Sequence, residues 1–115
     1  MIKAELVDRL IKFRSDRDWE QFHSPKELAI SLSIEASELL EWFQWKNDDE
    51  IQLKLNSDKR AALEDEVADV VAYLTYLCHD VGIDINKAVE AKINKNAQKY
   101  PIEKVKGRSE KYNEY

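Results

Sequence analysis

Residues 25–43 read PKELAISLSIEASELLEWF and hold the strongest helical pattern in the chain. Ser24, just before them, can cap a helix, with the proline at its first position and Glu27 at its third, which together form a capping box. Apolar side chains then recur at the helical period. The pattern predicts a helix that begins at Pro25 and runs to about Lys46, where Asn47-Asp48-Asp49 breaks it.

Three more helices are predicted, over residues 2–18, 58–81 and 85–99, with a weak helical turn at 51–55. Ser57 can cap the second of these, and Gly82 fits the left-handed position just after it. Asp84 can cap the last helix, which Pro101 stops. Long stretches rich in Ala, Leu, Glu and Lys also favour helix over strand. The predicted fold class is therefore all-α, with four helices.

Length and charge restrict the class of protein. The 115 residues fit one domain, and we expect a helical domain over 1–101 with a charged tail over 102–115 packing on it. The net charge of −5 argues against nucleic-acid binding. There is no apolar run long enough to span a membrane and no signal-peptide pattern, so we expect a cytoplasmic protein without a membrane partner. Cys78, the one cysteine, lies in an apolar helical stretch and is expected to be buried and inert.

Two of these helices carry carboxylates where apolar side chains are expected. Glu35 falls in the middle of the apolar arc of the 25–46 helix, and Glu38 lies one turn along, so the pair can converge on one point. On the 58–81 helix, Glu66 lies at the edge of the apolar arc, with Asp69 one turn further. The sequence therefore contains two candidate ligand pairs, Glu35-x-x-Glu38 and Glu66-x-x-Asp69.

The four carboxylates predict a metal site. Like charges brought together in a buried place are costly unless a cation lies among them. Oxygen ligands without cysteine suit Mg²⁺, or Mn²⁺ in its place, together with a phosphate ester. Ordinary surface acids are the alternative, but two motifs intrude into apolar arcs on consecutive helices. A di-iron centre is disfavoured because neither His23 nor His79 completes a Glu-x-x-His motif.

The same two helices also carry apolar residues away from their main arcs, namely Ile30, Ile34, Leu40 and Trp45 on the first and Ala68, Ala72 and Tyr76 on the second. Helices that are apolar all round pack against further elements. We therefore expect a homo-oligomer, either a dimer or a tetramer.

Several strings resemble one known family. EASELLEWFQWK at 35–46 and EVADVVAY at 66–73 resemble the MazG-like family of all-α nucleoside triphosphate pyrophosphohydrolases, and are most similar to its small dCTP pyrophosphatase branch. DWEQFH at 18–23, Lys92-x-x-x-Asn96, KYP at 99–101 and GRSEKY at 107–112 extend the likeness over nearly the whole chain. The ordered set is specific, although Glu-x-x-Glu alone is a weak signal.

The resemblance implies a four-helix MazG-like bundle and a set of site residues. By it, Mg²⁺ is held by Glu35, Glu38, Glu66 and Asp69. The substrate is contacted by Trp19, Trp45, Tyr73, Lys92, Asn96 and Tyr100, the first three around the base and the others along the phosphates. Lys111 and Tyr112 in the tail match the family pattern as well. For His23 two roles stay open, bonding to the substrate and packing beside the helix cap.

The implied reaction is Mg²⁺-dependent hydrolysis of a nucleoside triphosphate, dCTP or a modified dCTP, to the monophosphate and pyrophosphate. Such an enzyme would clean the nucleotide pool. Glu35 or Glu38 would orient the water that attacks the α-phosphorus, and the sequence does not choose between them. One alternative is a non-catalytic helical binding or regulatory module whose carboxylates pair with a partner's arginines. Another is the same fold acting on dUTP or a different nucleotide.

Overall fold

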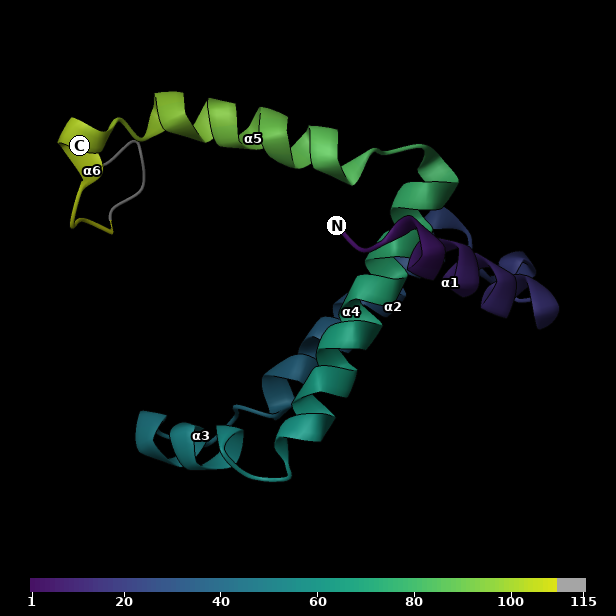
Figure 1. Cartoon of the computed structure of the whole chain (residues 1–115), viewed down its shortest axis with the longest axis horizontal. Coiled ribbons are helices and arrows are strands. Elements are labelled where there is room, and N and C mark those ends of the chain that lie inside the picture. Colours follow the sequence, from purple (N-terminus) through teal and green to yellow (C-terminus); the bar gives the residue numbers. More distant parts are fainter. Residues whose placement is uncertain (110–115) are drawn as a thin grey trace. The chain divides into compact units, whose positions relative to one another are not determined.

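The structure, a computed structural model, describes residues 1–109, and in this part of the chain every regular element is a helix (Figure 1). The predicted all-α class is confirmed. The chain forms two compact units, one from Ile2 to Gly82 and one made of Met1 and the chain from Ile83 onward. Each unit is described by itself. Among the described residues no helix is both long and apolar enough to cross a membrane.

The first unit is built on two long helices. Its elements are α1 (Ala4–Asp16), the short 3-10 helix η1 (Glu20–Phe22), α2 (Pro25–Glu41), α3 (Asp48–Leu55) and α4 (Arg60–Val81). Helices α2 and α4 lie side by side along their length, and α1 also contacts α4 (Figure 1). The buried apolar side chains are Leu28, Trp42, Tyr76 and Cys78. Cys78 is thus buried, as expected.

Helix α2 begins where predicted but ends earlier. The Ser24 hydroxyl accepts from the Glu27 amide at 3.2 Å, and Pro25 is the first helical residue. The helix ends at Glu41, however, and the predicted end at Lys46 is wrong. Beyond it Trp42 is fixed by residues distant in sequence: its indole donates to the Lys59 carbonyl at 3.1 Å, and Lys54 Nζ donates to the Trp42 carbonyl at 2.7 Å.

The segment between the long helices is more regular than predicted. The weak turn expected at 51–55 is a helix, α3, which starts at Asp48 because the Asn47 side chain caps it by accepting from the Glu50 amide at 2.9 Å. Ser57 does not cap α4, which begins at Arg60. Its hydroxyl instead accepts from the Lys59 amide inside a turn. α1 is two residues shorter at each end than the predicted 2–18, which is within ordinary fraying.

The second unit contains α5 (Ile85–Lys99) and α6 (Ile102–Val105). α5 has the predicted bounds, since the Asp84 side chain accepts from the Lys87 amide at 3.1 Å and Gly82 takes the left-handed conformation with φ +75°. α6 is a short helix within the stretch expected to be a charged tail. Lys111 and Tyr112 of that tail lie outside the described residues.

Candidate metal and nucleotide site

Helices α2 and α4 bring three carboxylates to one point. Glu35, Glu38 and Glu66 each offer one oxygen, and these three oxygens lie within 4.8 Å of one another. Glu35 and Glu66 are half-buried and Glu38 is exposed. The convergence follows from the i,i+3 spacing on α2 and from the packing of α2 along α4. We refer to Glu35, Glu38 and Glu66 as the carboxylate cluster.

The cluster has oxygen atoms without hydrogen-bond partners. Oε2 of Glu35 and Oε2 of Glu66 are both buried, and neither accepts a hydrogen bond. A buried carboxylate oxygen without a partner is unfavourable, and a divalent cation would satisfy both. The residues present therefore fit a hard divalent cation. Asp69 is exposed and is not one of the converging three, but its charge reaches both Glu35 and Glu66.

Two carboxylates of the cluster, Glu35 and Glu66, are more easily protonated than in water when no cation is bound. Burial raises the pKa of Glu35 to about 7, with further contributions from hydrogen bonding to Glu38 and from the negative charges of Glu38, Asp69 and Glu66. Burial also raises the pKa of Glu66, followed by the charge of Glu38. The protein therefore concentrates negative charge at this point at a cost in its own stability.

This electrostatic cost predicts a pH dependence of stability. Folded Glu35 keeps its proton up to a pKa of about 7, against 4.5 in the unfolded chain. Between these values the folded state binds more protons, so the free energy of unfolding of the metal-free protein should fall as pH rises through that window. His23, whose pKa burial lowers, acts with the opposite sign. Because His23 contributes to both proteins, the informative quantity is the difference between their free energies of unfolding. We expect Glu35→Gln to become increasingly more stable than the wild type from pH 5 to 8.

Urea unfolding in EDTA at several pH values measures this difference. A constant difference across the range would contradict the raised pKa of Glu35.

Tyr73, Tyr76 and His23 form a group of packed rings, and one of them, Tyr73, lies near the carboxylate cluster. Tyr73 on α4 is half-buried, and its hydroxyl pKa is raised by burial and then by the charges of Glu35, Asp69 and Glu38, which places it within electrostatic reach of the carboxylates. The His23 ring lies against Tyr73 at a centroid distance of 6.2 Å and against Tyr76 at 5.7 Å. The structure thus shows that His23 packs against these two rings, and a role for His23 toward the substrate stays a prediction.

Trp45 occupies an unusual backbone conformation. Its φ is +66°, in the left-handed region that favours glycine, and its side chain is 89% exposed. A bulky residue there costs about 1–2 kcal/mol, and so exposed a ring gains little packing in return. Such an outlier is typical of a functional position. The base-stacking role of Trp45 stays a prediction.

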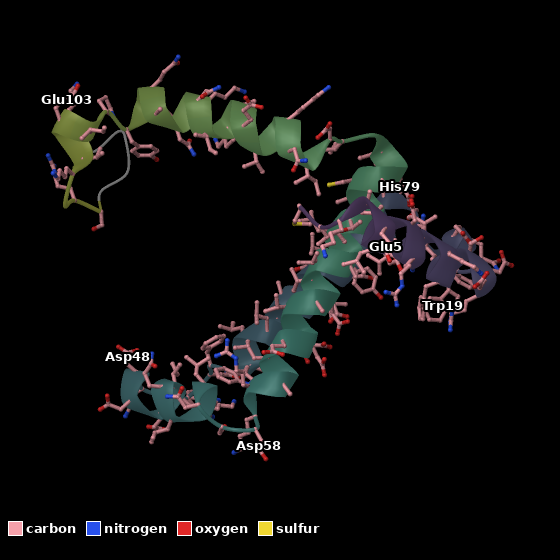
Figure 2. All side chains as sticks on the ribbon, viewed as in Figure 1. Glu5, Trp19, Asp48, Asp58, His79 and Glu103 are labelled. Carbon is pink, nitrogen blue, oxygen red and sulfur yellow. The ribbon has the colours of Figure 1, made fainter. Side chains whose placement is uncertain are left out.

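The other predicted substrate residues are placed less directly. Trp19 lies just beyond the C-terminal end of α1 (Figure 2). Its ring packs edge-on against that of Phe13, with a distance of 5.7 Å between the ring centroids. Lys92 and Asn96 lie one turn apart on α5, and Tyr100 follows at the end of that helix, with its amide bonded to the Asn96 carbonyl. These three share one helix face within the second unit. Their roles toward a nucleotide stay predictions.

The fold and the site together define an all-helical domain with an acidic centre built by two packed helices. The MazG-like family model matches residues 30–115. The chain belongs to the MazG-like family.

Named relatives agree with that assignment. The chain is 42% identical to dCTP pyrophosphatase 1 of Rattus norvegicus over 102 residues, which are 88% of this chain and 60% of the relative. It is 41% identical to dCTP pyrophosphatase 1 of Homo sapiens over 104 residues, 90% of this chain and 61% of the relative. The chain thus spans less than two thirds of the length of these relatives. A pyrophosphatase structure from Archaeoglobus fulgidus has a TM-score of 0.79 at 47% identity, covering 84% of this chain and 90% of that one.

Proposed function

We propose that this protein is a Mg²⁺-dependent nucleotide pyrophosphohydrolase that cleaves dCTP, or a modified dCTP, to the monophosphate and pyrophosphate. The observation that carries the proposal is the carboxylate cluster with its two buried, unpartnered oxygens. Family membership and the dCTP pyrophosphatase relatives support it. Nucleotide-pool housecleaning is the corresponding physiological role.

The proposed chemistry assigns a task to each residue. Glu35, Glu38, Glu66 and Asp69 would hold the cation, which when bound neutralises phosphate charge and lowers the pKa of a bound water. Glu35 or Glu38 orients the attacking water and accepts its proton. Trp19, Trp45 and Tyr73 offer flat faces for a base. Lys92, Asn96 and Tyr100 offer a cation, an amide and a hydroxyl for the phosphates.

A panel of nucleotides tests the substrate assignment. The purified protein should hydrolyse dCTP or a modified dCTP with a higher kcat/KM than dUTP, dATP or the ribonucleotides. A clear preference for dUTP would keep the reaction but overturn the assignment of the base. No hydrolysis of any nucleotide would overturn the proposed function.

Added Mg²⁺ should separate an enzyme from a non-catalytic binding module. At about 100 times its Kd, a ligand of the folded state stabilises it by about 2.7 kcal/mol, which for a domain of this size raises Tm by roughly 10 °C. We expect this shift in the wild type and its loss in Glu66→Gln. Glu64→Gln is the matched control, because Glu64 lies on the same helix, is exposed and forms an i,i+4 ion pair with Arg60. Equal shifts in all three proteins would contradict a metal site at the cluster.

We also propose that the protein is a homo-oligomer, a dimer or a tetramer. Ile30, Ile34, Leu40 and Val67 are 43–63% exposed on α2 and α4. A groove of about 690 Å³ between α1 and α4 is lined mainly by apolar side chains. A second copy would cover such surfaces, and the mass in solution would decide between the two states. A cytoplasmic location stays a prediction of the sequence.

A further inference from the structure

A charged side chain is the one buried residue of α1. Arg14 is 3% exposed, whereas Leu6 and Phe13 on the same helix are 39% and 45% exposed. Its guanidinium forms a bidentate ion pair with Asp80 in the last turn of α4, with Nη1–Oδ2 at 2.7 Å and Nη2–Oδ1 at 2.8 Å. Buried ion pairs contribute little net stability compared with well-packed apolar residues. Stability alone therefore does not account for this pair.

The ion pair fixes a tyrosine. The guanidinium carbon of Arg14 lies 4.7 Å from the ring centroid of Tyr76, a cation–π contact. The Tyr76 hydroxyl donates to the Leu10 carbonyl of α1 at 3.0 Å, and the residue is 6% exposed. Tyr76 is therefore held both at its ring face and at its hydroxyl.

Tyr76 in turn packs against the ring of His23. The His23 ring contacts Tyr76 and Tyr73, and Nδ1 of His23 is buried without a hydrogen-bond partner. Because Nδ1 makes no hydrogen bond, the orientation of the imidazole depends on its packing against the two tyrosine rings. A sequence of contacts thus runs from Asp80 through Arg14, Tyr76 and His23 to Tyr73, which lies within electrostatic reach of the carboxylate cluster.

We propose that the Arg14–Asp80 ion pair is a positioning device for the nucleotide site, which acts by holding Tyr76 so that the His23 ring stays fixed against Tyr73. The proposal rests on the proposed function, in which the His23 ring faces a bound nucleotide. Arg14 and Asp80 are positioning residues rather than catalytic ones. Burial and then the Arg14 charge lower the pKa of His23, and the charges of Asp80 and Glu20 oppose this more weakly.

Kinetics of three variants test the positioning role. Arg14→Met should raise KM for dCTP about tenfold with kcat within about threefold, since binding is weakened while the carboxylates are untouched. Arg14→Lys keeps the positive charge but lacks the planar guanidinium that bonds both carboxylate oxygens. Its KM for dCTP should therefore lie between those of the wild type and Arg14→Met. Ile11→Ala is the matched control, because it removes half-buried packing from the same helix without touching the ion pair. Equal changes of KM in Arg14→Met and Ile11→Ala, or an unchanged KM in Arg14→Met, would overturn the proposal.

A second measurement needs no turnover. The chain has two histidines, so NMR of the imidazole Cε1–H groups gives two signals, which the variant His79→Gln assigns. Ring currents of Tyr73 and Tyr76 should displace the His23 signal in the wild type. In Arg14→Met/Asp80→Asn, where neither charge remains, it should move toward the value of a free histidine. Arg14→Lys, which keeps a positive charge opposite Asp80 but lacks the planar guanidinium, serves the same comparison if the double variant does not fold, and it should displace the His23 signal in the same direction by a smaller amount.

The NMR and activity measurements distinguish failure of the positioning role from failure of the proposed function. A folded double variant with the wild-type His23 signal would overturn the positioning role. A wild-type protein that hydrolyses no nucleotide would instead count against the proposed function, and the NMR comparison would still judge how the ring is held.

Discussion

Glu38→Gln should abolish nucleotide hydrolysis, lowering kcat by about 10³-fold or more, while the helices stay folded. Several kcal/mol of transition-state stabilisation depend on a correctly bound metal, and Glu38 offers one of the three converging oxygens. In EDTA the variant should be as stable as the wild type or more stable. The reason is that the charge of Glu38 raises the pKa of both Glu35 and Glu66, and the amide removes that repulsion.

Hydrolysis of dCTP measures the expected loss of kcat in Glu38→Gln, and urea unfolding in EDTA measures its stability relative to the wild type. Glu64→Gln, with its exposed carboxylate on α4, is the control and should keep full activity. A Glu38→Gln protein with wild-type kcat would remove Glu38 from the site. A large loss of stability in EDTA would mean that the carboxylate is structural.

Trp45→Gly should make the protein more stable and a weaker binder of its substrate. Glycine adopts the left-handed conformation without penalty, so the free energy of unfolding should rise by about 1 kcal/mol. Stacking of a base on an aromatic ring contributes about 1–3 kcal/mol, so loss of the indole should raise KM for dCTP by about 5- to 150-fold. Stability and activity are thus expected to change in opposite directions.

Two further variants calibrate the Trp45 experiment. Trp45→Phe keeps a flat ring and the strained backbone, so we expect wild-type stability and a small change in KM. Gly82→Ala, at φ +75° with open space for the added methyl group, should lower stability by about 1 kcal/mol and so measures the conformational term alone. A Trp45→Gly protein with unchanged KM would exclude a base-stacking role and leave Trp45 as a residue of a subunit contact.

Local signals made much of the fold predictable. The caps at Ser24 and Asp84 and the left-handed Gly82 depend on residues within a few positions of one another, and each is found as expected. The converging carboxylates were predictable for a related reason, because helical periodicity places Glu35 inside an apolar arc.

Features that depend on distant residues were not predictable in the same way. α2 ends at Glu41, and the next residue, Trp42, is bonded to Lys54 and Lys59, which lie 12 and 17 positions away. Arg14 is an intermediate case. It falls between Leu10 and Ile11 on the apolar arc of its helix, so the reasoning that singled out Glu35 could have found it, but its partner Asp80 lies 66 positions further on.

The reaction itself is tested most directly by hydrolysis of dCTP in ¹⁸O-labelled water, once with Mg²⁺ and once with EDTA. The account predicts that dCMP carries the label and pyrophosphate does not, and that products form only with Mg²⁺. Label in pyrophosphate or orthophosphate, or equal turnover in EDTA, would contradict metal-dependent attack at the α-phosphorus.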